Sequence, residues 1–182
     1  MARNPFGWVT ERARPRLLAG LTFLLVVLTV WLAFLGRELV TPEAPLGIVS
    51  YELAGHFDGS ASILRSWSTE AKAAAMLTLG LDFLYLLVYP ACLALAAVLL
   101  GTRLGGGWHR AGWGVSWVAL AAAPLDAVEN LALIQQLVHG PSAVYAPLAW
   151  GCAVPKFASV VIAGAFLAFA GSVGLLARLR VA

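Results

Sequence analysis

Four long runs of apolar residues divide the chain, at about residues 17–35, 73–100, 113–138 and 147–176. A helix that crosses a bilayer needs about 20 mostly apolar residues, so each run is long enough to form one. The strands of a membrane β-barrel alternate over only about 10 residues, which these runs exceed. Because the connections at 101–112 and 139–146 are short, we expect consecutive helices to be antiparallel neighbours. The pattern predicts an all-α, four-transmembrane-helix antiparallel bundle that forms a single membrane domain over residues 1–182.

The composition is that of an integral membrane protein. Hydrophobic residues make up 61% of the chain, charged residues only 12%, and the mean hydropathy is +0.86. Soluble domains carry about 25% charged residues. Disordered chains are poor in apolar residues, and two cysteines are too few for a disulfide scaffold. The run at 17–35 exceeds the roughly 7–15 apolar residues of a signal-peptide core, so we expect the first helix to be retained.

Basic residues are distributed unequally between the two sides of the predicted membrane. One side, formed by the loop at 36–72, has three basic residues: Arg37, Arg65 and Lys72. The other side, which holds both termini, has eight: Arg3, Arg12, Arg14, Arg16, Arg103, Arg110, Arg178 and Arg180. Lysine and arginine are enriched in cytoplasmic segments. We therefore expect a multi-pass protein of the cell membrane with both termini in the cytoplasm. No basic cluster marks a face for nucleic acid, so nucleic acid is not an expected partner.

The long connection at about residues 36–72 is then expected to lie outside the cytoplasm. Its charged residues are five acidic and three basic, and Asp58 can cap a short helix over Gly59–Trp67. Ser68 or Thr69 can cap the second spanning helix. The connection also holds bulky apolar residues that favour packing, either on the outer mouth of the bundle or on the membrane surface: Tyr51, Phe57, Ile63, Leu64 and Trp67. The sequence leaves both placements open.

Four charged residues fall inside the predicted spans, and they are Asp82, Asp126, Glu129 and Lys156. Each costs at least about 2.5 kcal/mol at the bilayer centre, so such residues face the bundle interior and form pairs. Counted along each helix from its outer end, all four lie at a depth of about 12–17 Å. Three helices thus bring their charges to one layer in the outer half of the bilayer. If all are ionised, three carboxylates and one ammonium leave a surplus negative charge, which favours bound protons or a bound cation.

Polar side chains accompany these charges on the same helix faces. Tyr85 and Tyr89 follow Asp82 at spacings of three and seven, and Asn130 follows Asp126 and Glu129 on one stripe of the third span. We take the following set as candidates for binding a ligand or a proton: Asp82, Tyr85, Tyr89, Asp126, Glu129, Asn130 and Lys156. A buried ion-pair network that only fixes helix register is the alternative interpretation.

Three functional hypotheses fit this layer. The first is the binding of a small hydrophobic or amphiphilic molecule that enters from the bilayer, with acid–base transformation of that molecule left open. The second is a proton- or cation-coupled carrier, which with four helices would require a homo-oligomer. The third is an accessory subunit whose charges pair with a partner in a larger membrane complex. The sequence does not decide whether the protein is an enzyme, and no residue is assigned a catalytic role.

The sequence offers no support for a cofactor or a metal ion. All three histidines fall outside the spans, which removes the ligands of an intramembrane bis-histidine haem. No C-x-x-C, H-x-x-x-H, P-loop or G-x-S-x-G motif is present. Cys92 and Cys152 are predicted at depths that differ by more than about 15 Å, which excludes a disulfide between them.

Overall fold

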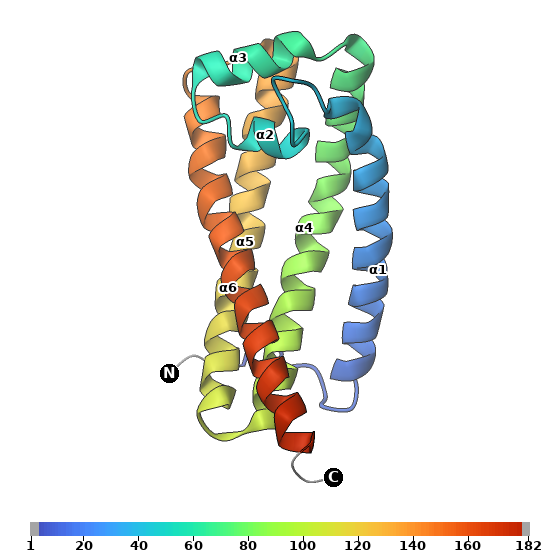
Figure 1. The fold of residues 1–182 in the computed structure, drawn as a ribbon, viewed down its shortest axis with the longest axis vertical. Coiled ribbons are helices and arrows are strands. Elements are labelled where there is room, and N and C mark those ends of the chain that lie inside the picture. The colour runs from blue at the N-terminus through green and yellow to red at the C-terminus, as the bar shows by residue number, and fades with distance from the viewer. Residues whose placement is uncertain (1–3, 180–182) are drawn as a thin grey trace. The chain divides into compact units, whose positions relative to one another are not determined.

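The computed structural model describes residues 4–179, and these form helices without any strand. The chain builds α1 (Arg14–Leu35), a 3₁₀ turn η1 (Gly36–Leu39), α2 (Ile48–Glu52) and α3 (Phe57–Ser66). The longer helices α4 (Thr69–Leu104), α5 (Gly106–His139) and α6 (Tyr145–Leu179) follow (Figure 1). The predicted all-α class is therefore confirmed, with four long apolar helices packed as a bundle.

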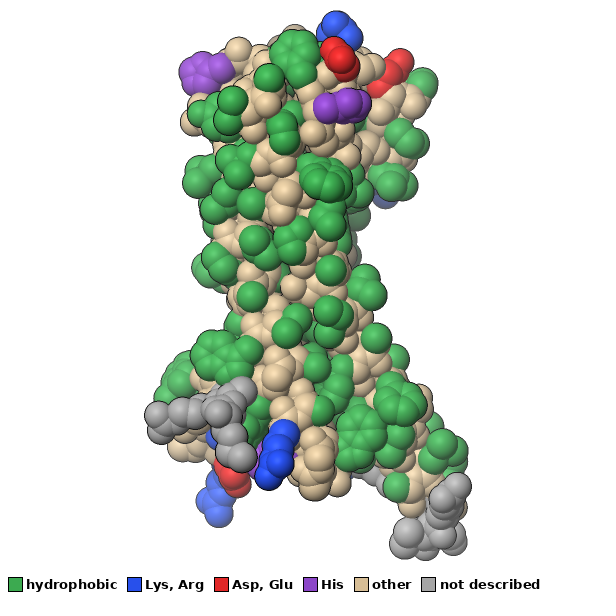
Figure 2. All heavy atoms as spheres, turned by 90° about the vertical axis from the view of Figure 1, so that its left-hand side faces the viewer, with side chains coloured by type: hydrophobic (Ala, Val, Ile, Leu, Met, Phe, Trp, Pro, Cys, Tyr) green, Lys and Arg blue, Asp and Glu red, His purple; other side chains and the backbone are tan. Residues whose placement is uncertain are grey.

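Four helices are long and apolar enough to cross a membrane: Arg14–Leu39, Thr69–Leu104, Gly106–His139 and Tyr145–Ala177. Apolar side chains are spread over the face seen in Figure 2, interspersed with backbone and small polar side chains. Large apolar residues such as Phe23 and Val161 are 72% and 68% exposed. In water this exposure would be costly, whereas hydrocarbon solvates it.

The sequence predicts a connection at 101–112 between the second and third spans. In the structure this connection is much shorter, since α4 continues to Leu104 and α5 begins at Gly106. Gly105 and Gly106 both have positive φ angles, 73° and 54°, which glycine adopts without strain. The two helices also approach closely here. A Cβ at Gly101 would lie 2.5 Å from the carbonyl oxygen of Trp108, and a Cβ at Gly112 would lie 2.5 Å from that of Ala97. Glycine at these positions therefore permits the contact that forms the tight helical hairpin.

The chain divides into two compact units, each built from segments of the four long helices. The first unit comprises the described residues up to Leu25, with Val88–Ala123 and the described residues from Phe157. Its apolar core includes Phe6, Val9, Leu95 and Val98. Arg14 is buried in it and donates hydrogen bonds to the carbonyl oxygens of Val9 and Phe6, at 3.2 and 3.3 Å. The segment before α1 is thus folded against the helices of its own unit.

The second unit comprises Val26–Leu87 and Pro124–Lys156 and includes α2 and α3. Trp67 is only 3% exposed, and its indole Nε1 donates to the carbonyl oxygen of Leu39 at 2.9 Å. Tyr51 is 1% exposed, and its hydroxyl donates to the carbonyl oxygen of Leu133 on α5 at 3.3 Å. The segment packs against the long helices of its own unit, with Ile63 and Leu64 in the same apolar core. Phe57 is the exception, because its side chain is 45% exposed.

The prediction that Asp58 caps the short helix is wrong. α3 begins at Phe57, so His56 is the N-cap residue and Asp58 lies in the first turn. The imidazole of His56 packs over Gly59, where a Cβ would lie 2.6 Å from its Cε1 atom. The predicted capping of the second span is confirmed, since Ser68 Oγ accepts a hydrogen bond from the Ala71 amide at 3.2 Å. Cys92 and Cys152 are both free, as the depth argument predicted.

Candidate functional site

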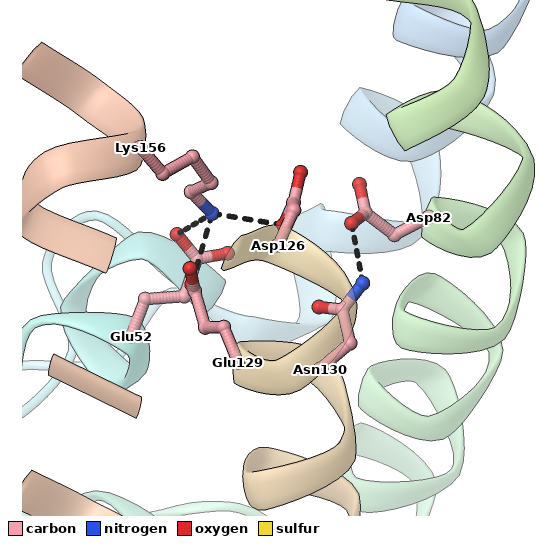
Figure 3. A network of polar contacts seen from close by, with 6 residues as sticks. All are labelled: Glu52, Asp82, Asp126, Glu129, Asn130 and Lys156. Atoms are coloured by element: carbon pink, nitrogen blue, oxygen red, sulfur yellow. Dashed lines mark hydrogen bonds and ion pairs between the residues drawn. The ribbon is translucent and has the colours of Figure 1, made fainter. Parts of the chain in front are cut away.

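Lys156 lies at the centre of a buried ionic cluster in the second unit (Figure 3). Its ammonium nitrogen Nζ is 2.9 Å from Glu129 Oε1, 3.1 Å from Asp126 Oδ1 and 3.4 Å from Glu52 Oε2. All four residues are buried, and Glu129 is 0% exposed. An ammonium group has three protons to donate, so one lysine can satisfy three carboxylates at once. We call Glu52, Asp126, Glu129 and Lys156 the lysine cluster.

Three helices bring the lysine cluster together. Asp126 and Glu129 are three residues apart on α5, so both side chains project from one face of that helix. Lys156 comes from α6, directly after Pro155, and Glu52 is the last residue of the short helix α2. Burial of Tyr51 beside it fixes α2 against the long helices, and this directs the Glu52 carboxylate towards Lys156.

A second polar pair lies next to the lysine cluster. Asn130 Nδ2 donates to Asp82 Oδ2 at 2.6 Å, joining α5 to α4 (Figure 3). Asn130 is buried, whereas Asp82 is only half-buried. Because Asn130 adjoins Glu129 in the chain, α5 connects the lysine cluster directly to the pair with Asp82.

The structure places most of the sequence-predicted residues in this one region. The contacts just described are formed by five of them: Asp82, Asp126, Glu129, Asn130 and Lys156. Tyr85 is nearby on α4, and its phenol oxygen accepts a hydrogen bond from Thr29 Oγ1 at 3.4 Å. Tyr89 is buried and belongs to the first unit.

Glu52 is the functional candidate that sequence reasoning missed. It lies in the long connection between the first two spans, whereas the charged site candidates predicted from the sequence all lie inside the spans. Five residues of helix are too few to show a helical period. The one available signal was local, because Glu52 stands between Tyr51 and Leu53 in an otherwise apolar stretch. An acidic residue in such a stretch must find a partner if the stretch is buried.

The region carries more negative than positive charge. The region contains one ammonium group, that of Lys156, and four carboxyl groups, those of Glu52, Asp82, Asp126 and Glu129. Full ionisation would therefore leave a formal charge of −3. Burial raises the pKa of Glu52 above its ordinary value, although Lys156 opposes the shift. Glu129 Oε2 and Asn130 Oδ1 are buried without a hydrogen-bond partner among the described residues. The arrangement is thus suited to holding protons or accepting a hydrogen-bond donor.

A cavity of about 350 Å³ borders these acids in the second unit and is partly open to the outside. Its polar wall includes the carboxyl groups of Glu52 and Asp82 together with Tyr85, Thr29 and Thr78. Its apolar wall is formed by α1, the start of α2 and α4: Leu32, Ala33, Leu46, Ile48 and Leu79, with Gly36 and Gly47 completing the lining. The cavity therefore combines an acidic end with an apolar body, the usual character of a small-molecule site.

Within the described part of the chain, no group of three or more His, Cys, Asp or Glu side chains is arranged to hold a metal ion. Comparison with protein-family models, with curated proteins and with solved structures gives no match.

Proposed function

We propose that this chain is an integral membrane protein that binds a small amphiphilic molecule in the cavity bordered by Glu52 and Asp82. Four helices of sufficient length and apolar character support the membrane assignment. The unequal distribution of basic residues supports a cell-membrane protein with both termini in the cytoplasm, antiparallel spans and the segment at 36–72 on the outer side. The single observation that carries the ligand proposal is the cavity, in which half-buried Asp82 meets an apolar wall.

The chemistry of the cavity defines the ligand class. Two carboxyl groups and two hydroxyl-bearing threonines present mainly acceptor oxygens, so the polar end of the ligand is a hydrogen-bond donor and preferably a cation. An amine head would also offset the surplus negative charge of the region. The apolar wall from α1 and α4 takes a hydrocarbon body of limited length, because the volume is about 350 Å³.

Lys156 has a supporting role in this proposal. Burying three carboxylates without a cation would strongly destabilise the folded state. The ammonium group of Lys156 offsets this cost by pairing with all three. Asp82 is not bonded to Lys156 and instead accepts from Asn130, so its second oxygen remains available on the cavity side. The lysine cluster thus holds the polar end of the site in place while Asp82 meets the ligand.

The test uses the full-length protein in a mild maltoside detergent and three probes with equal alkyl chains: decylamine, decanol and decyl sulfate. A ligand that binds only the folded protein raises the thermal unfolding midpoint, and at equal concentration the tighter ligand raises it more. We expect decylamine to raise the midpoint more than decanol, and decyl sulfate to give no increase. Native mass spectrometry of the purified protein is a parallel measurement, in which a co-purifying amphiphile supports the same site.

Asp82→Asn is the decisive variant, because it removes the charge while keeping the shape and the contact with Asn130. Asp58→Asn is the matched control, since Asp58 is an exposed acid on α3 that does not line the cavity. The proposal requires the decylamine effect to be lost in Asp82→Asn and kept in Asp58→Asn. An equal effect in all three proteins, or equal stabilisation by amine and sulfate, would overturn it.

The surplus of negative charge also favours a second function, a proton- or cation-coupled carrier that acts as an oligomer. Flux in proteoliposomes that depends on a pH gradient and is lost in Asp82→Asn would support the carrier. Ligand binding without such flux would favour the binding protein. Retention of a partner protein through purification would instead support an accessory subunit of a membrane complex.

A further inference from the structure

A second cavity in the same unit has the opposite charge. It measures about 310 Å³ and lies where α3, the start of α4 and the end of α5 meet. It shares no lining residue with the acidic cavity. Its polar wall is formed by Arg65, Lys72 and Gln136, and its apolar wall includes Phe57, Leu64 and Leu137. No acidic residue is among the residues that line it.

Gln136 is a buried residue of this cavity wall whose side-chain amide is unpaired within the described part of the chain. Its side chain is 0% exposed, yet neither the amide nitrogen Nε2 nor the amide oxygen Oε1 has a hydrogen-bond partner among the described residues. Buried polar atoms are nearly always paired, because each unpaired group loses its hydration without compensation. Gln136 forms part of the wall of this cavity, so a ligand held there is positioned to pair with its amide.

Arg65 and Lys72 define the charge of that ligand. Both side chains are exposed on the rim of the cavity and bring two positive charges to one opening. A guanidinium group binds phosphate through two parallel hydrogen bonds, and lysine adds a point charge. The amide N–H of Gln136 can donate a further hydrogen bond to an oxyanion that the two cations hold.

We propose that this cavity binds the phosphate head of an anionic amphiphile. Arg65 and Lys72 would hold the phosphate, Gln136 Nε2 would donate to one of its oxygens, and Leu64 and Leu137 would contact the first part of the hydrocarbon chain. Lys72 is near the start of the α4 span and Gln136 near the end of the α5 span, which places the site at a membrane boundary. In that position the basic rim lies at the level of the lipid headgroups.

The experiment measures lipid retention on the full-length protein by native mass spectrometry in mild detergent. The probes are dioctanoyl phosphatidylglycerol and dioctanoyl phosphatidylcholine, which differ in net charge but not in chains. The variants are Arg65→Gln, Lys72→Gln and the double change. Arg37→Gln is the matched control, because Arg37 is an exposed arginine in the same unit that does not line the cavity. Gln136→Leu tests the amide separately, with thermal unfolding run alongside to confirm that each variant is folded.

We expect wild type to retain phosphatidylglycerol over phosphatidylcholine, and each cation removed to weaken retention about tenfold. Arg37→Gln should behave as wild type, and Gln136→Leu should weaken retention of phosphatidylglycerol. If millimolar inorganic phosphate displaces phosphatidylglycerol, the phosphate group alone accounts for recognition. If phosphatidylglycerol is retained, the site recognises the whole lipid. Equal retention of both lipids, or unchanged selectivity in the double variant, would overturn the proposal.

Discussion

Glu52 Oε2 and Lys156 Nζ lie 3.4 Å apart although 104 positions separate the two residues in the chain. The contact joins the short helix α2, in the connection between the first two spans, to the middle of α6. The connection therefore contributes a side chain to the buried ionic cluster. Its conformation and the state of the cluster are linked, which leads to predictions about charge, pH and packing.

Removal of the central cation should be strongly destabilising. Lys156→Met would leave three buried carboxylates without their ammonium partner, and the expected loss is about 3–5 kcal/mol of unfolding free energy. Adding Glu129→Gln should restore part of the loss, because it removes one orphaned charge. The measurement is unfolding in detergent micelles, with exposed Lys72→Met as the control, for which the expected change is within about 0.5 kcal/mol. Equal stability of Lys156→Met and Lys72→Met would contradict the lysine cluster.

The stability contributed by Glu52 should fall as the pH rises. Burial raises the pKa of Glu52 in the folded protein, so the folded state favours its protonated form more than the unfolded state does. The stability that this provides is fully present below the unfolded pKa of 4.5 and is lost as the pH rises through the higher folded pKa. Glu52→Gln cannot ionise and should therefore gain stability relative to wild type between pH 4.5 and alkaline pH. Thermal unfolding of both proteins across this range is the check, and a constant difference would refute it.

The anchoring of the connection at 36–72 should depend on Trp67. Its side chain is 3% exposed and its indole donates to the Leu39 carbonyl oxygen, so Trp67→Ala should cost about 3–5 kcal/mol. Trp8→Ala is the control, because Trp8 is 80% exposed. Unfolding free energy and protease sensitivity of residues 36–72 are the two measurements. If both variants lost equal stability, Trp67 would not anchor the segment.

The positions of the long helices could be predicted from the sequence because hydropathy alone indicates them. The start of α4 could be predicted from the Ser68 cap, but most other helix ends could not, since the terminal turns contain polar residues such as Arg103. A helix tolerates these residues, but a hydropathy window excludes them. The short helical hairpin depends instead on Gly105 and Gly106, whose positive φ angles allow the chain to reverse almost immediately.

Part of the candidate site was also predictable. Asp126, Glu129 and Asn130 share one face of α5 by spacing alone, and their depth matches that of Lys156 on α6. Glu52 was not predictable, because its place depends on tertiary contacts of Tyr51 and on no periodic pattern. Neither cavity was predictable, since both are formed by side chains from three or more separate segments.

Two glycines on α5 should respond to alanine with opposite signs. A Cβ at Gly112 would lie 2.5 Å from the carbonyl oxygen of Ala97 on α4, so Gly112→Ala must push the two helices apart and should cost about 1–3 kcal/mol. Gly114 has no atom within 4 Å of the corresponding position. Gly114→Ala should stabilise the helix by about 0.5–1 kcal/mol, because alanine loses less backbone entropy. Unfolding in detergent micelles measures both changes. Stabilisation by Gly112→Ala as well as by Gly114→Ala would show that α4 and α5 do not pack closely at Gly112.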